Sequence, residues 1–494
     1  MEYTNPVIPG SHPDPSVTRA GDEYVLATSS FEYVPGVPLF RSRNLIDWTP
    51  IGHAFSRPSQ VDLADVEASE GVFAPTIRYH DGTYYLVTTV VGGGGHLLVV
   101  ADDPAGEWSD PVWIDGAGID PDLFWDDGTC YLTYRAGEEG IVQTTLDTET
   151  GETGDERRSL GRRFVADYTE APHLYERDGT YYLLVAEGGT HTNHAVCVAR
   201  ADSPTGPFVG FDDNPVLTHR HASGAFTPIQ AVGHGDLVAT PDGDWWLVFL
   251  GVRHHGGHPG WYHLGRETFL APVEWRDGWP VVYGGDRIET TMRVDRDLDR
   301  DADATPWTTD GFGDALGREW NTRYRDRTDR YTLADGELAL EGATDSLAAP
   351  DCSFLGRRQQ HLDGRASVVV ADAGAGTAGL AAVADERHHY ALGVDGDEAS
   401  LTLRVGEATE RVAAETLPDG PVRLVIDATT ERYRFSAVGG DGESVALGTA
   451  RSKYLAAEVT GGFTGVYLGV YATAGAGDDD GRPARLREFA YGPA

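Results

Sequence analysis

Five segments in the first half of the chain share one pattern of hydrophobic and polar positions. In each, a short run rich in Val, Ile and Leu leads into a turn rich in Asp and Gly, and an alternating run of aromatic and β-branched residues follows. The segments are HPDPSVTRAGDEYVLAT from His12, VFAPTIRYHDGTYYLVT from Val72, GIDPDLFWDDGTCYLTY from Gly118, TEAPHLYERDGTYYLLV from Thr169 and GHGDLVATPDGDWWLVF from Gly233. Each segment predicts a β-hairpin.

The spacing of these hairpins indicates a repeat architecture. The five turns fall at Gly21, Asp81, Asp127, Asp178 and Asp242, and more strand-like segments follow most of them. The intervals are roughly 45 to 65 residues, the length of a four-stranded propeller blade. The repeat therefore predicts a five-bladed β-propeller over residues 1–295.

The hydrophobic alternation stops in the charged segment DRDLDRDADATP and returns after it. We expect a linker over residues 296–305. Beyond it, the segments GELALEG, RASVVVADA, YALGV, ASLTLRV, PVRLVIDA and YRFSAV alternate with turn residues about every ten positions. This alternation predicts an antiparallel β-sandwich over residues 306–494, and the whole chain is expected to be all-β.

The starts of the five hairpins are candidate site positions. The innermost strand of each propeller blade runs along the central axis, so equivalent positions converge at one mouth of the channel. The hairpin starts are Asp14, Phe73 with Ala74, Asp120, Glu170 and His234. A single Asp before Pro commonly accepts hydrogen bonds in a turn. Because the carboxyl groups of Asp14, Asp120 and Glu170 recur at matching repeat positions, we expect these three to form one site.

Charge narrows the range of partners. The chain has 494 residues, 78 Asp and Glu against 39 Lys and Arg, and a formal net charge of −39. Such a surface repels phosphate backbones and anionic lipids, so we expect a neutral oligosaccharide ligand and neither nucleic acid nor membrane as a partner. It suits concentrated salt, where self-repulsion is screened, and favours a halophilic protein. A GC-rich genome would explain the single lysine, Lys453, but not the doubled acid count.

Three further expectations follow from the composition. No basic segment leads into an apolar core near the N-terminus, and no long apolar run occurs, so the sequence favours a cytoplasmic protein. Cys130, Cys197 and Cys352 lie far apart, as reduced core residues do. The glycine run VGGGGH at 91–96 lacks the ending of a phosphate-binding loop and is expected to be a loop within a blade. The sequence leaves open whether the chain forms a homo-oligomer.

Several long motifs resemble those of glycoside hydrolase family 43, and more narrowly its β-xylosidases with a C-terminal β-sandwich. They include NPVIPGSHPDPS, GIDPDLFWDDG, EAPHLYERDGTYYLLVAEGGT, LGRETFLAPVEWRDGWPVV and, in the second half, FLGRRQQHLDG. The resemblance covers nearly the whole chain. It implies a five-bladed β-propeller followed by a concanavalin-like sandwich.

The resemblance also implies catalytic roles for the three carboxyl groups. Asp14 would be the general base, Asp120 the carboxylate that orients the acid and tunes its pKa, and Glu170 the general acid. Inversion at an anomeric carbon needs one carboxylate to activate water and a protonated carboxyl to protonate the leaving oxygen. We expect the charge of Asp120 to raise the pKa of Glu170.

Further residues of the sugar subsite are implied in the same way. They are Phe31, Phe73, His234, Arg266 and, from the second domain, Phe463, which as an alternative could belong to the sandwich core. Two positions depart from many relatives, which have Trp at the position of Phe73 and Gly at the position of Ala171. Aromatic faces suit the C–H side of a sugar, and a guanidinium offers paired donors to hydroxyls.

No cofactor is expected. The histidines of RHHGGHPGWYH, His254, His255, His258 and His263, lack the fixed spacing and partnering carboxylate of a metal site. The resemblance leaves one alternative open, a structural ion near His234.

The expected function is therefore an inverting, exo-acting glycoside hydrolase that releases terminal xylose from β-1,4-xylo-oligosaccharides. The alternatives are an α-L-arabinofuranosidase, or an enzyme with both activities, and a sugar-binding propeller without catalysis. The three carboxyl groups argue against the last, because a lectin has no need of an acid held protonated by its neighbours. Retaining fructan hydrolases are a further five-bladed class, but their motifs do not match HPDPS and TEAP.

Overall fold

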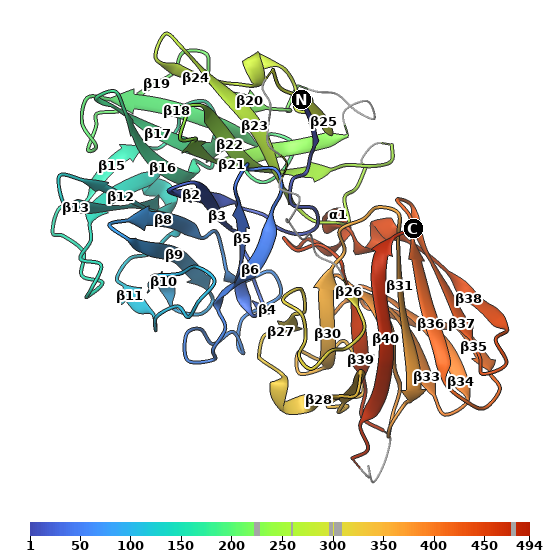
Figure 1. The fold of residues 1–494 in the computed structure, drawn as a ribbon. Coiled ribbons are helices and arrows are strands. Elements are labelled where there is room, and N and C mark those ends of the chain that lie inside the picture. Colours follow the sequence, from blue (N-terminus) through green and yellow to red (C-terminus); the bar gives the residue numbers. More distant parts are fainter. Residues whose placement is uncertain (222–227, 258–259, 296–299, 301–308, 476–480) are drawn as a thin grey trace. The chain divides into compact units, whose positions relative to one another are not determined.

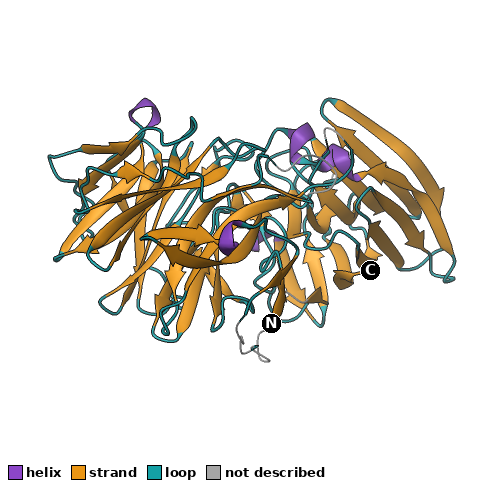
Figure 2. Cartoon of the chain, turned by 90° about the horizontal axis from the view of Figure 1, so that it is seen from above, coloured by secondary structure: helices purple, strands orange, loops and turns teal. Residues whose placement is uncertain are grey.

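The structure is a computed structural model that describes residues 1–221, 228–257, 260–295, 300, 309–475 and 481–494. Strands make up almost all of its regular structure (Figure 2). The helical elements are α1 (Ala457–Thr460) and the 3-10 turns η1 (Gly137–Glu139), η3 (Tyr283–Gly285), η4 (Thr328–Arg330) and η5 (Ser452–Leu455). No helix of the described residues is long and apolar enough to cross a membrane.

The chain divides into two compact units. The first contains Met1–His258 and Arg266–Pro306, and the second contains Pro259–Gly265 and Trp307–Ala494. The short segment ending at Gly265 thus groups with the C-terminal half, which its sequence gave no reason to expect. The predicted linker 296–305 lies, apart from Arg300, outside the described residues.

Five antiparallel sheets build the first unit (Figure 1). The first contains β2 (Ser16–Ala20), β3 (Glu23–Ala27), β5 (Gly36–Ser42) and β6 (Thr49–Phe55). The second contains β7 (Gly71–Val72), β8 (Thr76–His80), β9 (Thr83–Val91), β10 (Gly95–Ala101) and β11 (Val112–Ile114). The third contains β12 (Ile119–Asp126), β13 (Thr129–Arg135), β14 (Ile141–Thr145) and β15 (Arg158–Gly161).

The fourth and fifth sheets complete this unit. The fourth contains β16 (Glu170–Arg177), β17 (Thr180–Glu187), β18 (Ala195–Ala201), β19 (Val209–Gly210) and β20 (Leu217–Thr218). The fifth contains β21 (Ile229–Ala239), β22 (Trp245–Arg253), β23 (Glu267–Arg276) and β24 (Trp279–Val282). The leading hairpin strands of the five sheets contact one another in a closed cycle, β2 with β8, β8 with β12, β12 with β16, β16 with β21 and β21 with β2.

The five predicted hairpins are confirmed. In the third, Asp126 pairs with Thr129 across the two-residue turn Asp127-Gly128, whose φ angles are 45° and 74°. Two positive φ angles define the tight turn that matches the twist of a hairpin, and Asp-Gly is among the sequences that favour it. The glycine run at 91–96 begins at the end of β9 and ends in β10, as expected of a loop within a sheet.

The N-terminal segment is attached to the last strands of the same unit. Strand β1 (Glu2–Thr4) pairs with β25 (Thr291–Arg293), and Ile8 forms a β-bridge with Thr268 of β23. The Asn5 side chain donates a hydrogen bond to the Leu270 carbonyl, 2.9 Å away. The start of the unit is therefore held by its end.

Two antiparallel sheets build the second unit. One contains β26 (Thr309–Asp310), β28 (Tyr331–Ala334), β29 (Glu337–Leu340), β31 (Gly364–Asp372), β36 (Val422–Ala428), β37 (Arg432–Val438), β38 (Ser444–Arg451) and β40 (Ala484–Pro493). The other contains β30 (Ser353–Arg358), β32 (Ala378–Val383), β33 (His388–Asp395), β34 (Glu398–Val405), β35 (Ala408–Thr416) and β39 (Tyr467–Ala472). One buried cluster takes Leu424 and Phe435 from the first sheet and Leu392 and Leu468 from the second. This shared core confirms the predicted sandwich.

The three cysteines are free and buried, as predicted. Two further strands, β4 (Tyr33–Val34) and β27 (Thr322–Arg323), are only two residues long.

Candidate active site

Four site positions have left-handed backbone conformations. The φ angles are 56° at Asp14, 55° at Asp120, 50° at Ala171 and 47° at His234. The last three fall where the strand pairing shifts register, in β-bulges of β12, β16 and β21. A bulge redirects side chains, and a non-glycine residue there costs of order 1–3 kcal/mol that the surrounding structure must offset. These positions are therefore marked by strain as well as by sequence.

The same geometry corrects the alignment of the repeats. Glu170 was expected at the position equivalent to Asp14 and Asp120. In the structure, Ala171 occupies the left-handed position of the fourth sheet, and Glu170 pairs with Ala186 one residue earlier. In the third sheet the residue paired in this way is Ile119. Glu170 thus reaches the site from a different backbone position than the two aspartates.

Asp14 is a buried carboxylate with several partners. Ser29 Oγ donates a hydrogen bond to its Oδ2 at 2.6 Å, and Arg266 Nη1 donates to its Oδ1 at 2.9 Å. His234 Nδ1 lies 3.6 Å from Oδ1. Burial alone would raise the pKa of Asp14, but Arg266, His234 and the Ser29 hydrogen bond outweigh burial and lower it. Asp14 is therefore ionised at neutral pH.

His234 is not the cation that balances the charge of Asp14 at neutral pH. Burial lowers the pKa of His234 to about 4, although Asp14 opposes the shift. The imidazole is therefore neutral at pH 7, and Arg266 is the cation that faces Asp14.

Asp120 and Glu170 are neighbouring carboxyl groups, the first buried and the second nearly so. Burial, and then the charges of Glu170 and Asp14, raise the pKa of Asp120 well above its ordinary value. Burial also raises the pKa of Glu170 to about 7, while Arg135, 3.5 Å away, opposes the shift and Asp14 adds to it. We conclude that the pair retains a proton near neutral pH.

The expected reason for the raised pKa of Glu170 was incomplete. The charge of Asp120 is the expected cause, but burial of Glu170 is the largest contribution, and the carboxylate charge that adds to it is that of Asp14. The Ala171 N–H donates to Asp120 Oδ2 at 3.1 Å, which ties Asp120 to the residue that follows the acid.

Aromatic residues expected around the sugar also lie together. The rings of Phe31 and Phe73 meet edge to face with centroids 5.4 Å apart. The guanidinium of Arg266 lies over the Phe31 ring at 5.7 Å. Because Arg266 also contacts Asp14, the structure joins Phe31, Phe73, Arg266, His234 and Asp14 in one site.

Phe463 belongs to the second unit. It follows α1 in a loop, and its side chain is 37% exposed. The alternative that Phe463 is sandwich core is therefore wrong, while its contact with sugar stays a prediction.

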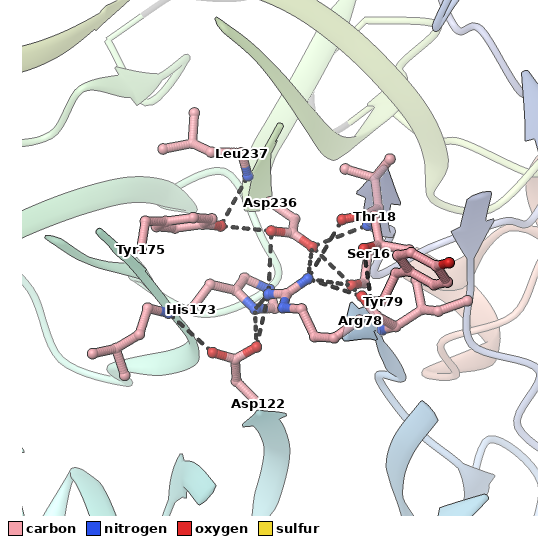
Figure 3. A network of polar contacts seen from close by, with 12 residues as sticks. Ser16, Thr18, Arg78, Tyr79, Asp122, His173, Tyr175, Asp236 and Leu237 are labelled. Atoms are coloured by element: carbon pink, nitrogen blue, oxygen red, sulfur yellow. Dashed lines mark hydrogen bonds and ion pairs between the residues drawn. The ribbon is translucent and has the colours of Figure 1, made fainter. Parts of the chain in front are cut away.

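A polar network that the sequence did not reveal lies along the leading strands (Figure 3). Arg78 donates to Asp122 at 2.7 Å and to Asp236 at 2.8 Å, and its Nη2 lies 2.9 Å from His173 Nδ1. Tyr175 donates to Asp236 at 2.5 Å. Four of the five sheets thus contribute to this network, and Ser16 of the remaining sheet donates to Asp236 at 2.7 Å.

One signal could have revealed this network. Asp122 lies two residues after Asp120, His173 two after Ala171, and Asp236 two after His234. The three residues thus recur at one matching position of the repeat. A charged or polar residue there, in a strand that should be buried, needs a partner. Burial alone would raise the pKa of Asp236, but Arg78 keeps it below its ordinary range.

The described residues contain no group of three or more His, Cys, Asp or Glu side chains arranged to hold a metal ion. His258, one member of the histidine-rich segment, lies outside them.

Comparison with known proteins gives matches over both units. The family model described as "Glycosyl hydrolases family 43" matches residues 3–280, and the model "Beta xylosidase C-terminal Concanavalin A-like domain" matches residues 309–492. A non-reducing end alpha-L-arabinofuranosidase of Bacteroides ovatus is 37% identical over 99% of this chain and 94% of the relative. A xylosidase/arabinosidase of Butyrivibrio fibrisolvens is 34% identical over 95% of each chain.

A solved structure shares the fold over nearly the full length. It is a xylan beta-1,4-xylosidase from Bacillus halodurans, with a TM-score of 0.90, 30% identity and 99% of each chain covered.

Proposed function

Because the chain belongs to glycoside hydrolase family 43, we propose that it is an inverting, exo-acting β-xylosidase that releases terminal xylose from β-1,4-xylo-oligosaccharides. The observation that carries this proposal is the opposite shift of two pKa values within one site. Asp14 has a lowered pKa, and that of Glu170 is raised to about 7. Hydrolysis by a pair of carboxyl groups requires one that stays ionised and one that stays protonated, and in inversion the ionised group acts as the base.

The reaction follows from these two protonation states. Asp14 accepts a proton from water as the water oxygen bonds to the anomeric carbon. The bond from that carbon to the glycosidic oxygen breaks, and Glu170 donates its proton to the leaving oxygen. No covalent intermediate forms, so the released sugar has the opposite anomeric configuration.

Asp120 has a supporting role in this proposal. We assign the proton retained by the pair to Glu170 and the charge to Asp120; the N–H of Ala171 favours the ionised form of Asp120, although burial raises the pKa of Asp120. Arg266, Phe31 and Phe73 would hold the terminal sugar beside Asp14.

We also propose that the five sheets of the first unit are the five blades of a propeller over residues 1–295. The closed cycle of contacts among the leading strands supports this arrangement. The sandwich would then span residues 306–494 after the linker 296–305.

The identity of the terminal sugar has two candidates. The relatives' names include both xylosidase and arabinofuranosidase. An α-L-arabinofuranosidase is therefore the second candidate, and it would use the same three carboxyl groups. The net charge of −39 favours a neutral oligosaccharide in either case.

Proton NMR of xylobiose hydrolysis tests the proposal. The reaction is run in roughly 2 to 3 M KCl to screen the acidic surface, and the first anomer of released xylose is recorded. Initial α-xylose from the non-reducing end is the expected result. Initial β-xylose would overturn inversion, and cleavage of arabinofuranosides alone would establish the second candidate. If folded protein cleaves neither, the result favours the alternative of a sugar-binding propeller without catalysis.

A further inference from the structure

A buried carboxylate organises the loop that leads to Glu170. Glu187 ends β17 and is fully buried. Its Oε1 accepts a hydrogen bond from the Phe164 N–H at 2.6 Å, and its Oε2 accepts from the N–H groups of Val165 at 2.8 Å and Ala166 at 2.7 Å. Three consecutive N–H groups therefore converge on one side chain and are satisfied by it.

Further contacts fix the end of this loop. Thr169 Oγ1 lies 2.9 Å from Glu187 Oε1 and 2.6 Å from the Arg162 carbonyl oxygen. The Gly188 N–H donates to the Asp167 carbonyl at 2.8 Å. The loop 162–169 is thus attached at several points to the end of β17, and the next residue is Glu170.

The same loop forms a wall of a cavity of about 510 Å³. Arg162, Tyr168 and Thr169 line it, together with Arg135, which contacts Glu170. Its described lining includes none of the residues that contact Asp14. Glu170 is not in the described lining either, so the cavity adjoins the acid only through Arg135 and the loop.

Tyr168 shows that the loop presents side chains toward solvent at this cavity. It has a φ of 62°, and 64% of its surface is exposed. A large aromatic residue in the left-handed region is a backbone outlier that the surrounding structure must enforce.

We propose that Glu187 is a positioning residue for the general acid: by holding loop 162–169 it places Glu170 against the glycosidic oxygen. This inference rests on the proposed function. The hydrogen bonds of Glu187 are to the loop backbone, Thr169 and Cys197, so its role is to act through Glu170 and not in the chemistry itself.

Glu187→Gln tests the inference. Each carboxylate oxygen accepts at least one backbone N–H, so an amide group at either position faces a donor and the loop must shift. A misplacement of about 1 Å can cost about 100-fold in rate. We expect kcat/KM for xylobiose to fall about 10- to 100-fold. The rate on 2,4-dinitrophenyl β-xyloside should change little, because this leaving group departs without protonation.

Two further variants make the result decisive. Glu176→Gln is the matched control, since Glu176 is an exposed carboxylate at the far end of the same hairpin that accepts one N–H, from Gly179. It should leave both rates unchanged. Thr169→Val removes the hydroxyl beside Glu187 and decides the question if Glu187→Gln does not fold. It should show the same dependence on the leaving group to a smaller degree.

A loss of equal size on both substrates would overturn the positioning role. Glu170→Gln is measured in parallel to separate this from the proposed function. If it too shows no dependence on the leaving group, Glu170 is not the acid and the proposed function fails. If only Glu187→Gln and Thr169→Val lack the dependence, the positioning role alone fails. An enzyme that prefers arabinofuranosides is tested with the corresponding arabinofuranoside pair.

Discussion

Replacing Arg135 by Gln should move the alkaline limb of the pH profile upward. Glu170 must be protonated to act as the acid, and burial raises its pKa to about 7. Arg135 Nη1 lies 3.5 Å from Glu170 Oε2 and favours the ionised form. Removing this cation stabilises the protonated form, so the pKa of Glu170 should rise further.

The distance sets the size of the shift. Two unit charges 3.5 Å apart interact by about 1.2 kcal/mol at the dielectric constant of water and by about 4.7 kcal/mol at an effective value of 20. These energies correspond to about 0.9 and about 3.5 pH units. The two side chains are 25% and 13% exposed, so water screens them in part. We expect a shift of at least about one unit, to about pH 8 or above.

The measurement is kcat/KM for xylobiose from about pH 5 to 9, which reports the essential acid of the free enzyme. Arg163→Gln is the matched control. Arg163 lines the same cavity, but its partner is Asp167 at 3.2 Å. Its profile should keep the limb at about 7. A limb for Arg135→Gln that stays at about 7 or moves to lower pH would refute this account of the acid.

Two other substitutions test the polar network and the base. Arg78→Met removes the cation shared by Asp122 and Asp236, so it should lower the free energy of unfolding, measured by urea denaturation, by about 3–5 kcal/mol. The control is Arg276→Met at an exposed ion pair, which should lower it by about 0–1 kcal/mol. Because Arg78 lowers the pKa of Asp236, the stability that this ion pair contributes is present above the ordinary aspartate pKa of 3.8 and should diminish as the pH falls below 3.8. Equal losses of stability for both variants would contradict the ion-pair argument. Asp14→Asn should slow xylobiose and dinitrophenyl xyloside hydrolysis alike, by about 10²- to 10⁴-fold, since both need an activated water; a loss confined to xylobiose would mean that Asp14 acts on the leaving group.

The hairpins could be predicted because their determinants are local. Asp127-Gly128 specifies its own turn, and the alternation on each side specifies the strands. The convergence of Asp14 and Asp120 followed from the repeat alone. The backbone offset of Glu170 did not, because a bulge is visible only in the pairing of two strands.

The buried charges could not be predicted, because each depends on segments distant in sequence. Arg78 reads as an ordinary polar residue of a strand, and its partner Asp236 lies 158 residues away. Glu187 reads as an acid at the end of a strand, and its partners belong to a loop more than 20 residues earlier. The roles of these charged residues depend on their burial between sheets, which only the folded structure shows.

The attachment of the N-terminal segment to the end of the first unit has a consequence during synthesis. Arg266, the cation that holds Asp14, is made 252 residues after it, and β25, the partner of β1, is made later still. At about 5 to 20 residues per second, a ribosome needs roughly 13 to 50 s to cover that interval. During this time the nascent chain carries Asp14 without Arg266 and without the strands that complete the unit. The site around Asp14 can therefore be completed only after the last strands of the unit have emerged.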